Sequence, residues 1–212
     1  VYKGDATDRT FANPKARILD IASKTGLYSL YAAYSIFKLR STQSQGLFDL
    51  FSDQESDELW QEVVAENIFA VCRTRKAQLI TRRTLLGFHN EAKANISYVP
   101  DLTAQVVVYK NTLVRNLNNA QDFWQLGNSQ QSTNRQQKDM KFDAIIGNPP
   151  YQVNIGEQKD NYGIPLYHQF VEVARAMKPN FITMIMPSRW FTGGRGLDHF
   201  RTSMLTDRRM RA

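Results

Sequence analysis

The fold of this chain is decided by the stretch Phe142-Asp143-Ala144-Ile145-Ile146-Gly147-Asn148-Pro149-Pro150-Tyr151. An apolar run typical of a strand ends at Gly147, and two consecutive prolines then prevent the strand from continuing. The pattern predicts a buried strand that carries a rigid polar turn at its carboxyl end. In open α/β sheets, ligands bind at that edge of the sheet.

The turn is rich in hydrogen-bond acceptors. The proline rings fix φ, remove two backbone donors and keep the residue before each ring out of the helical region. The Asn148 side-chain oxygen and the Pro149 carbonyl remain as acceptors, with the Tyr151 ring beside them. Two fixed acceptors and a stacking face suit a planar NH2 group. An isolated Asn-Pro-Pro is more often an ordinary turn, but the preceding strand and Tyr151 favour a functional site.

Such an amine is a poor nucleophile because its lone pair is delocalised. If acceptors hold both of its hydrogens, the nitrogen can become tetrahedral as it attacks. The stabilisation is then greatest at the transition state.

The rest of the chain alternates between strand and helix patterns. The succession favours a parallel, doubly wound α/β sheet in a single domain over residues 1–212, with later strands missing at the carboxyl end. Strand patterns are expected at 17–21, 67–72, 95–101, 142–147 and 181–187. Helical patterns are expected at 27–37, 49–64, 74–86, 102–124, 166–177 and 197–211, with a mobile surface loop at 127–138.

Composition sets bounds on the class of protein. The 212 residues, 42% of them hydrophobic, are enough for one domain with a substantial core. No apolar run is long enough to span a membrane, and no signal peptide is visible. The single cysteine, Cys72, excludes an internal disulfide and a cysteine-based metal site and fits a reducing cytosol. The net charge of +7 permits a polyanionic partner without requiring one.

The stretch 142–151 resembles the catalytic motif of amino-group methyltransferases that use S-adenosylmethionine. The resemblance is closest to the N6-adenine DNA methyltransferases of bacterial restriction-modification systems, and residues 187–194 resemble a segment of restriction-enzyme methylases. The resemblance implies a Rossmann-like fold. It also implies that the chain is a piece of a longer type II or type I-like restriction-modification protein. It also implies that Asn148 and Pro149 hold the target amine, that Pro150 keeps the turn rigid and that Tyr151 stacks on the base.

A first cofactor-binding region is implied between the strand at 17–21 and the helix after it. A strand, a short polar loop with glycine and a helix open a nucleotide-binding fold, in which the loop backbone and helix N-terminus face the ligand. Asp20 and Gly26 match the family positions that hold the methionine part of the cofactor, and Ala22 lies in the loop between them. Lys24 stands where a further glycine is usual, so the loop is expected to follow a different path.

A second cofactor-binding region is implied after the next two strands. The family usually has an acidic residue at the end of the second strand to bind the ribose, where this chain has Cys72 and Arg73. Cys72 is therefore a cofactor candidate by position, and the ribose contact stays unassigned. Asp101 matches a carboxylate that accepts from the cofactor's adenine amine, although an exposed turn aspartate is an equal alternative.

The target side is expected to involve residues after the fifth strand. Trp190 or Phe191 is a candidate second face for a bound base, next to Arg195 in a glycine-rich loop. The alternative is that both aromatic rings simply cover the end of the sheet. The basic helices at 74–86 and 197–211 are candidates for DNA phosphate contact, or simply solvated faces. In the first of them, Ala77, Ile80 and Thr84 are expected to face the sheet.

Together these features predict a site-specific methyltransferase that acts on a flipped adenine of double-stranded DNA, with S-adenosylmethionine as donor. It is expected in the bacterial cytoplasm, associated with the nucleoid when bound to DNA. Nuclease, helicase and target-recognition domains are expected partners, fused or separate. Three alternatives stay open: a release-factor glutamine N5 methyltransferase, an RNA base-amine methyltransferase and a catalytically silent DNA-binding fragment.

Overall fold

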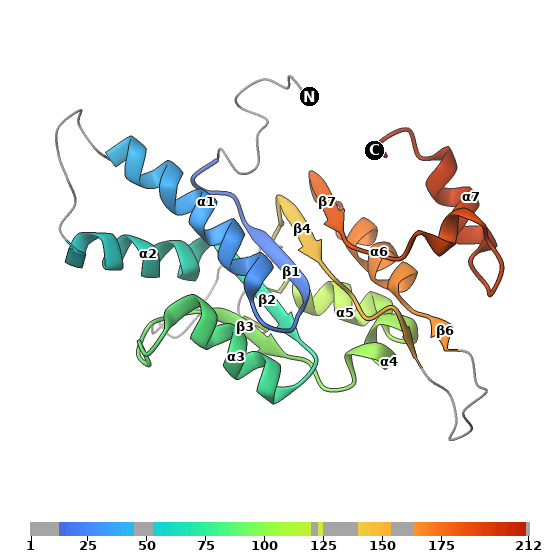
Figure 1. Ribbon diagram of the computed structural model, residues 1–212, viewed down its shortest axis with the longest axis horizontal. Helices are drawn as coiled ribbons and strands as arrows, with labels where there is room; N and C mark the ends of the chain where they lie inside the picture. Colours follow the sequence, from blue (N-terminus) through green and yellow to red (C-terminus); the bar gives the residue numbers. More distant parts are fainter. Residues whose placement is uncertain (1–12, 45–52, 120–122, 125–139, 154–162, 211–212) are drawn as a thin grey trace, which may run out of the picture.

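A five-stranded, wholly parallel sheet forms the centre of the protein (Figure 1). The structure is a computed structural model that describes residues 13–44, 53–119, 123–124, 140–153 and 163–210. In spatial order the strands are β3 (Asn95–Tyr98), β2 (Ile68–Cys72), β1 (Ile18–Ser23), β4 (Ala144–Gly147) and β7 (Phe181–Met184). The strand order reverses between β1 and β4, which is where ligands bind in folds of this class. The predicted Rossmann-like α/β fold is confirmed.

Helices cover both faces of the sheet because alternate strand residues point to opposite sides. Ile18 and Ile68 pack with one set of helices, whereas Leu19 and Phe69 pack with the other. The first set is α1 (Leu27–Ser44), α2 (Asp53–Asn67) and α3 (Arg75–Leu86). The second is α4 (Leu102–Val107), α5 (Lys110–Leu117) and α6 (Tyr167–Ala176). Along the described part of the chain, no helix combines the length and apolar character that a bilayer crossing requires.

A smaller layer lies beyond β7. It contains the 3-10 turn η3 (Ser188–Phe191) and α7 (Asp198–Thr206), which contact each other beside α6 (Figure 1). A two-stranded antiparallel ribbon, β5 (Gln152–Val153) with β6 (Ile164–Pro165), joins β4 to α6. The surface loop predicted at 127–138 lies outside the described residues.

The prediction of one helical pattern over 102–124 was wrong. The helix stops at Val107, and a second helix begins at Lys110. Val107, Val108 and Tyr109 are all exposed at the break, and branched and aromatic side chains disfavour helix where no packing holds them. Trp124 is not part of the helix: its indole N–H donates to the Leu117 carbonyl at 2.9 Å.

The predicted inner face of α3 was also wrong in part. Ala77 is buried as expected, but Ile80 is 38% exposed, and Thr81 takes the inner position instead. The Thr81 hydroxyl lies 3.2 Å from the Ser23 hydroxyl and 3.7 Å from the Cys72 sulfur. A polar inward residue was missed because hydrophobic spacing alone does not register a threonine with hydrogen-bond partners in the sheet.

Replacing Gly26 by alanine is expected to cost about 2–4 kcal/mol of folding free energy. Gly26 has φ of +78°, and a Cβ there would lie 3.1 Å from both Cα and Cγ2 of Thr81. The cost therefore combines left-handed backbone strain with overpacking between α1 and α3. Gly196→Ala is the matched control, because Gly196 has φ of +79° and a Cβ added there would meet no atom within 4 Å. Urea unfolding should show that the control loses only about 1–2 kcal/mol of folding free energy. Equal losses in the two variants would contradict the close approach of Gly26 to Thr81.

Candidate active site at the carboxyl edge of the sheet

The strand β4 delivers the Asn-Pro-Pro-Tyr turn to the carboxyl edge of the sheet. All four residues of β4 are buried, and the strand pairs with β1 and β7 on its two sides. The pairing continues past the strand end, because Ile185 N–H donates to the Gly147 carbonyl at 3.0 Å. The turn therefore starts from a position that is fixed by both neighbouring strands.

Within the turn, Asn148 is exposed and Pro149 is buried. The Asn148 side chain makes no hydrogen bond to any described residue. Tyr151 is 43% exposed, and its carbonyl accepts from Leu166 N–H at 3.0 Å. The backbone on both sides of the turn is thus anchored, while the Asn148 amide and the Tyr151 ring remain accessible.

Asp143, at the other end of the motif, has a structural role. Its carboxylate accepts from Arg17 N–H at 2.9 Å and from the Asn180 side-chain amide at 3.3 Å. Its carbonyl accepts from Phe181 N–H at 3.0 Å. Asp143 therefore ties the amino ends of β1 and β7 to β4, a role that the sequence motif alone did not indicate.

Asp20 lies in β1 opposite Ile146 and is 1% exposed. Its carboxylate accepts from the Ser29 hydroxyl at 3.1 Å and from Ala22 N–H at 3.4 Å. Burial raises the pKa of the Asp20 carboxyl to about 6 in spite of these hydrogen bonds, which act to lower it. A Cβ on Gly147 would lie 3.8 Å from an Asp20 carboxylate oxygen, so the first cofactor candidate adjoins the Asn-Pro-Pro-Tyr turn.

Cys72 and Arg73 have different surroundings, although they are adjacent in sequence. Cys72 is completely buried against Thr81, and burial raises the pKa of its thiol to about 11. A neutral thiol that is buried against α3 is a poor contact for a cofactor. Cys72 does not line the open hollow at the carboxyl edge of the sheet. Arg73 is exposed and lines it.

An open hollow of about 580 Å³ lies at the carboxyl edge of the sheet. Its size is within the usual range of small-molecule sites. Of the five predicted cofactor residues only Asp101 lines it; the other described residues of the lining are Arg73, Thr103, Gln152 and Val153. Arg73 was not among the predicted cofactor residues, although the sequence places it directly after the second predicted strand.

Asp101 has a clear structural role at the hollow. Its backbone is left-handed, with φ of +48°, and its carboxylate caps α4 by accepting from Ala104 N–H at 3.4 Å. Asp101 is thus an exposed turn aspartate, which the structural alternative described, and it also caps a helix. The carboxylate remains exposed at the edge of the hollow, where it retains free acceptor positions.

The two aromatic candidates after β7 differ in exposure. Trp190 is 4% exposed and packs against Phe200, with their ring centres 5.8 Å apart. Phe191 is 53% exposed and stacks on Trp190 at 4.0 Å. Trp190 therefore supports the end of the sheet, as the structural alternative proposed, and Phe191 is the ring of the pair that is accessible to a base.

The glycine-rich loop after Phe191 is held by α7. Gly194 N–H donates to the Asp198 carboxylate at 2.9 Å, and Arg201 Nε donates to the Phe191 carbonyl at 2.7 Å. Arg195 is exposed in this loop with φ of +51°. Arg201, predicted as a DNA contact, thus has a structural role in placing Phe191.

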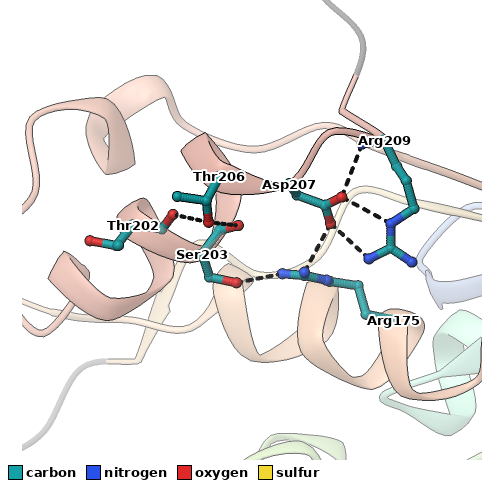
Figure 2. Close-up of polar contacts among 6 residues, drawn as sticks. All are labelled: Arg175, Thr202, Ser203, Thr206, Asp207 and Arg209. Atoms are coloured by element: carbon teal, nitrogen blue, oxygen red, sulfur yellow. Dashed lines mark hydrogen bonds and ion pairs between the residues drawn. The ribbon is translucent and has the colours of Figure 1, made fainter.

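An ion-pair cluster fastens α7 to α6 (Figure 2). Arg175 donates to the Ser203 hydroxyl at 2.8 Å and to the Asp207 carboxylate at 2.9 Å. Arg209 donates to the same carboxylate at 2.8 Å, and its hydrogen bond is the main cause that lowers the pKa of Asp207. Of the predicted basic groups here, Arg208 is exposed, whereas Arg209 is paired and Arg211 lies outside the described residues.

Two arginines of the basic helix α3 are also engaged with the fold. Arg82 donates to the carbonyls of Asn90 and Ala92, both at 2.7 Å. Arg83 lies over the Phe88 ring at 4.4 Å. Among the residues that the structure describes, no three His, Cys, Asp or Glu side chains gather in a way that would hold a metal ion.

Comparison with known proteins agrees with this arrangement. The model of the Eco57I restriction-modification methylase family matches residues 66–212. A protein of Mycoplasma pneumoniae described as "Uncharacterized adenine-specific methylase" is 44% identical over 52 residues, which are 24% of this chain. The match spans 12% of that protein's length, about an eighth. Since the family model covers more than half of the chain, this protein belongs to the Eco57I restriction-modification methylase family.

Proposed function

We propose that this protein transfers a methyl group from S-adenosylmethionine to the N6 amine of adenine in double-stranded DNA. The observation that carries the proposal is the state of Asn148. Its amide is exposed, has no hydrogen bond to a described residue and directly follows the buried end of β4. The family, a class of restriction-modification methylases, and the adenine-specific description of the relative support it.

On this proposal, the turn holds both hydrogens of the amine. The Asn148 side-chain oxygen and the Pro149 carbonyl accept them, so the nitrogen lone pair is directed away from the ring as the nitrogen becomes tetrahedral. Tyr151 stacks on one face of the base. Phe191, whose position is fixed by Arg201 and Trp190, is the candidate for the other face.

The residues around the hollow fit S-adenosylmethionine, which supplies an electrophilic methyl group on a sulfonium when it is bound. The hollow has the volume and polar lining that a nucleoside requires. Asp101 offers an acceptor for the cofactor's adenine amine, and Asp20 lies beside the catalytic turn for the methionine part. Gly26 allows α1 to approach α3, and Ala22 N–H is directed to Asp20.

DNA as the substrate requires the target base to leave the duplex, because a paired adenine keeps its amine inside the stack. The net charge of +7 favours a polyanion, and exposed cations such as Lys76, Arg195 and Arg208 are candidate phosphate contacts. A restriction-modification role would further pair this activity with a nuclease, helicase or target-recognition domain, at the bacterial nucleoid.

Replacing Tyr151 by alanine should lower the rate of methyl transfer by about 10- to 100-fold, since stacking of a base on an aromatic ring contributes about 1–3 kcal/mol. Tyr151→Phe keeps the ring and should retain most of the activity. Initial rates at saturating cofactor would check both variants. A phenylalanine variant as slow as the alanine variant would show that the hydroxyl matters instead of the stacking face.

The proposed substrate is tested by comparing acceptors. Purified protein is incubated with radiolabelled S-adenosylmethionine and duplex DNA, single-stranded RNA or a bacterial release factor. Label is expected in duplex DNA that contains the recognised site, for which a mixture of genomic fragments is a suitable source. Transfer only to RNA or to the release factor would assign one of the alternatives, and cofactor binding without transfer to any acceptor would refute the proposal.

A further inference from the structure

The charge at the end of β2 is unusual for a nucleoside site. In dinucleotide-binding α/β folds, a carboxylate after the second strand accepts from the ribose hydroxyls, whereas an arginine nearby accommodates a phosphate on the ribose. Here the carboxylate is absent: Cys72 is buried against Thr81, and Arg73 is the charged residue that follows the strand.

Arg73 is available to a ligand. It is exposed at the rim of the hollow and makes no hydrogen bond or ion pair with any described residue. By contrast, Arg75 lies over the Tyr98 ring at 4.5 Å and Arg82 is bonded to backbone carbonyls. A guanidinium offers five donors in a planar fork that matches a phosphate, and it offers no acceptor for a ribose hydroxyl proton.

The neighbouring groups are compatible with an anion on the β2 side of the hollow. Thr103 and Gln152 are neutral side chains that can donate hydrogen bonds. Asp101 is the one acid among the lining residues that the structure describes, and its carboxylate accepts from Ala104 N–H in capping α4. The adenine amine suits Asp101, and a phosphate on the ribose suits Arg73.

We infer that the hollow binds adenine nucleotides that carry a phosphate on the 2′ or 3′ position of the ribose, with Arg73 as the phosphate-binding residue. The inference rests on the proposed nucleoside site and adds a ligand class to it. Such nucleotides would compete with S-adenosylmethionine and so inhibit methyl transfer.

Calorimetry with adenosine and three adenosine monophosphates tests this inference. Adenosine 2′-monophosphate or 3′-monophosphate should bind at least about tenfold more tightly than adenosine, because a charge-assisted bidentate contact is added. Adenosine 5′-monophosphate should show no such gain. The gain should disappear in Arg73→Gln and persist in Lys93→Gln, an exposed control that removes the same charge but does not line the hollow.

Several results would overturn the inference. One is that neither ribose phosphate binds more tightly than adenosine, and another is that the gain persists in Arg73→Gln. Loss of duplex DNA affinity in Arg73→Gln, without a change in nucleotide affinity, would show that Arg73 contacts DNA instead. If S-adenosylmethionine binds but a ribose phosphate adds no affinity over adenosine, this inference alone would be refuted. Arg73-dependent binding of the ribose phosphates without methyl transfer to any acceptor would refute only the proposed function.

Discussion

Replacing Asn148 by alanine should lower kcat for methyl transfer by about 10²–10³-fold, the usual loss when one preorganised hydrogen-bonding group is removed from a transition state. The side-chain oxygen is the acceptor that holds one hydrogen of the target amine as the nitrogen becomes tetrahedral. The Pro149 carbonyl alone leaves the other hydrogen unheld, so the lone pair stays delocalised. Single-turnover rates at saturating cofactor and DNA would measure the loss.

The fold and the cofactor site should not change in this variant. Asn148 is exposed and has no hydrogen bond to a described residue, so the folding free energy should stay within about 0.5 kcal/mol of the wild type. Asn111→Ala, an exposed asparagine on α5, provides a matched control that should retain full activity. Full methylation by Asn148→Ala with normal cofactor binding would show that the proposed mechanism is wrong.

Replacing Asp20 by asparagine should raise stability at neutral pH by about 1–3 kcal/mol. Burial raises the pKa of the Asp20 carboxyl from 3.8 to about 6, so ionisation is less favourable in the folded protein than in the unfolded chain. Below pH 3.8 the Asp20 carboxyl is mostly protonated in both the folded and the unfolded state, so its ionisation does not change the folding free energy. As the pH rises from about 4 to 6, the folded state loses about 3 kcal/mol relative to the unfolded state, since each pKa unit corresponds to about 1.4 kcal/mol.

Urea unfolding of the wild type and Asp20→Asn between pH 4 and pH 7.5 would measure this effect. The two curves of folding free energy should converge near pH 4, diverge as the pH rises to about 6 and stay apart above it, with the variant more stable. Parallel curves would show that the Asp20 carboxyl does not titrate differently in the two states.

The same substitution should weaken cofactor binding by about tenfold or more. A buried carboxylate that lowers stability at the ligand-binding edge of a sheet is a typical feature of a functional site. If Asp20 serves the cationic methionine part of the cofactor, asparagine removes a charge-assisted hydrogen bond. Unchanged affinity for S-adenosylmethionine would assign Asp20 a structural role through Ser29 and Ala22.

The strands, and the placement of the Asn-Pro-Pro-Tyr turn at the carboxyl edge of the sheet, followed from local sequence patterns. Each strand is a short apolar run, and the Asn-Pro-Pro turn has a conformation that its prolines largely determine. Parallel pairing then brings the carboxyl ends of β1 and β4 together. These features were predictable because they depend on few residues that are close in sequence.

Features that depend on contacts between distant segments were not predictable. Trp190 is buried because Phe200 of α7 packs on it, and Cys72 faces Thr81 of α3 instead of the hollow. Arg82 and Arg201 looked like DNA contacts by charge, yet both bond backbone carbonyls. Sequence spacing identifies a charged side chain but does not reveal an acceptor that the fold brings next to it.

The most direct test of the central claim is identification of the methylated base. Duplex DNA that has been treated with the purified protein and deuterated-methyl S-adenosylmethionine is digested to nucleosides and analysed by mass spectrometry. The proposed function predicts deuterated N6-methyladenine in wild-type reactions and its near absence with Asn148→Ala. Label on any other base, or equal N6-methyladenine with both proteins, would contradict it.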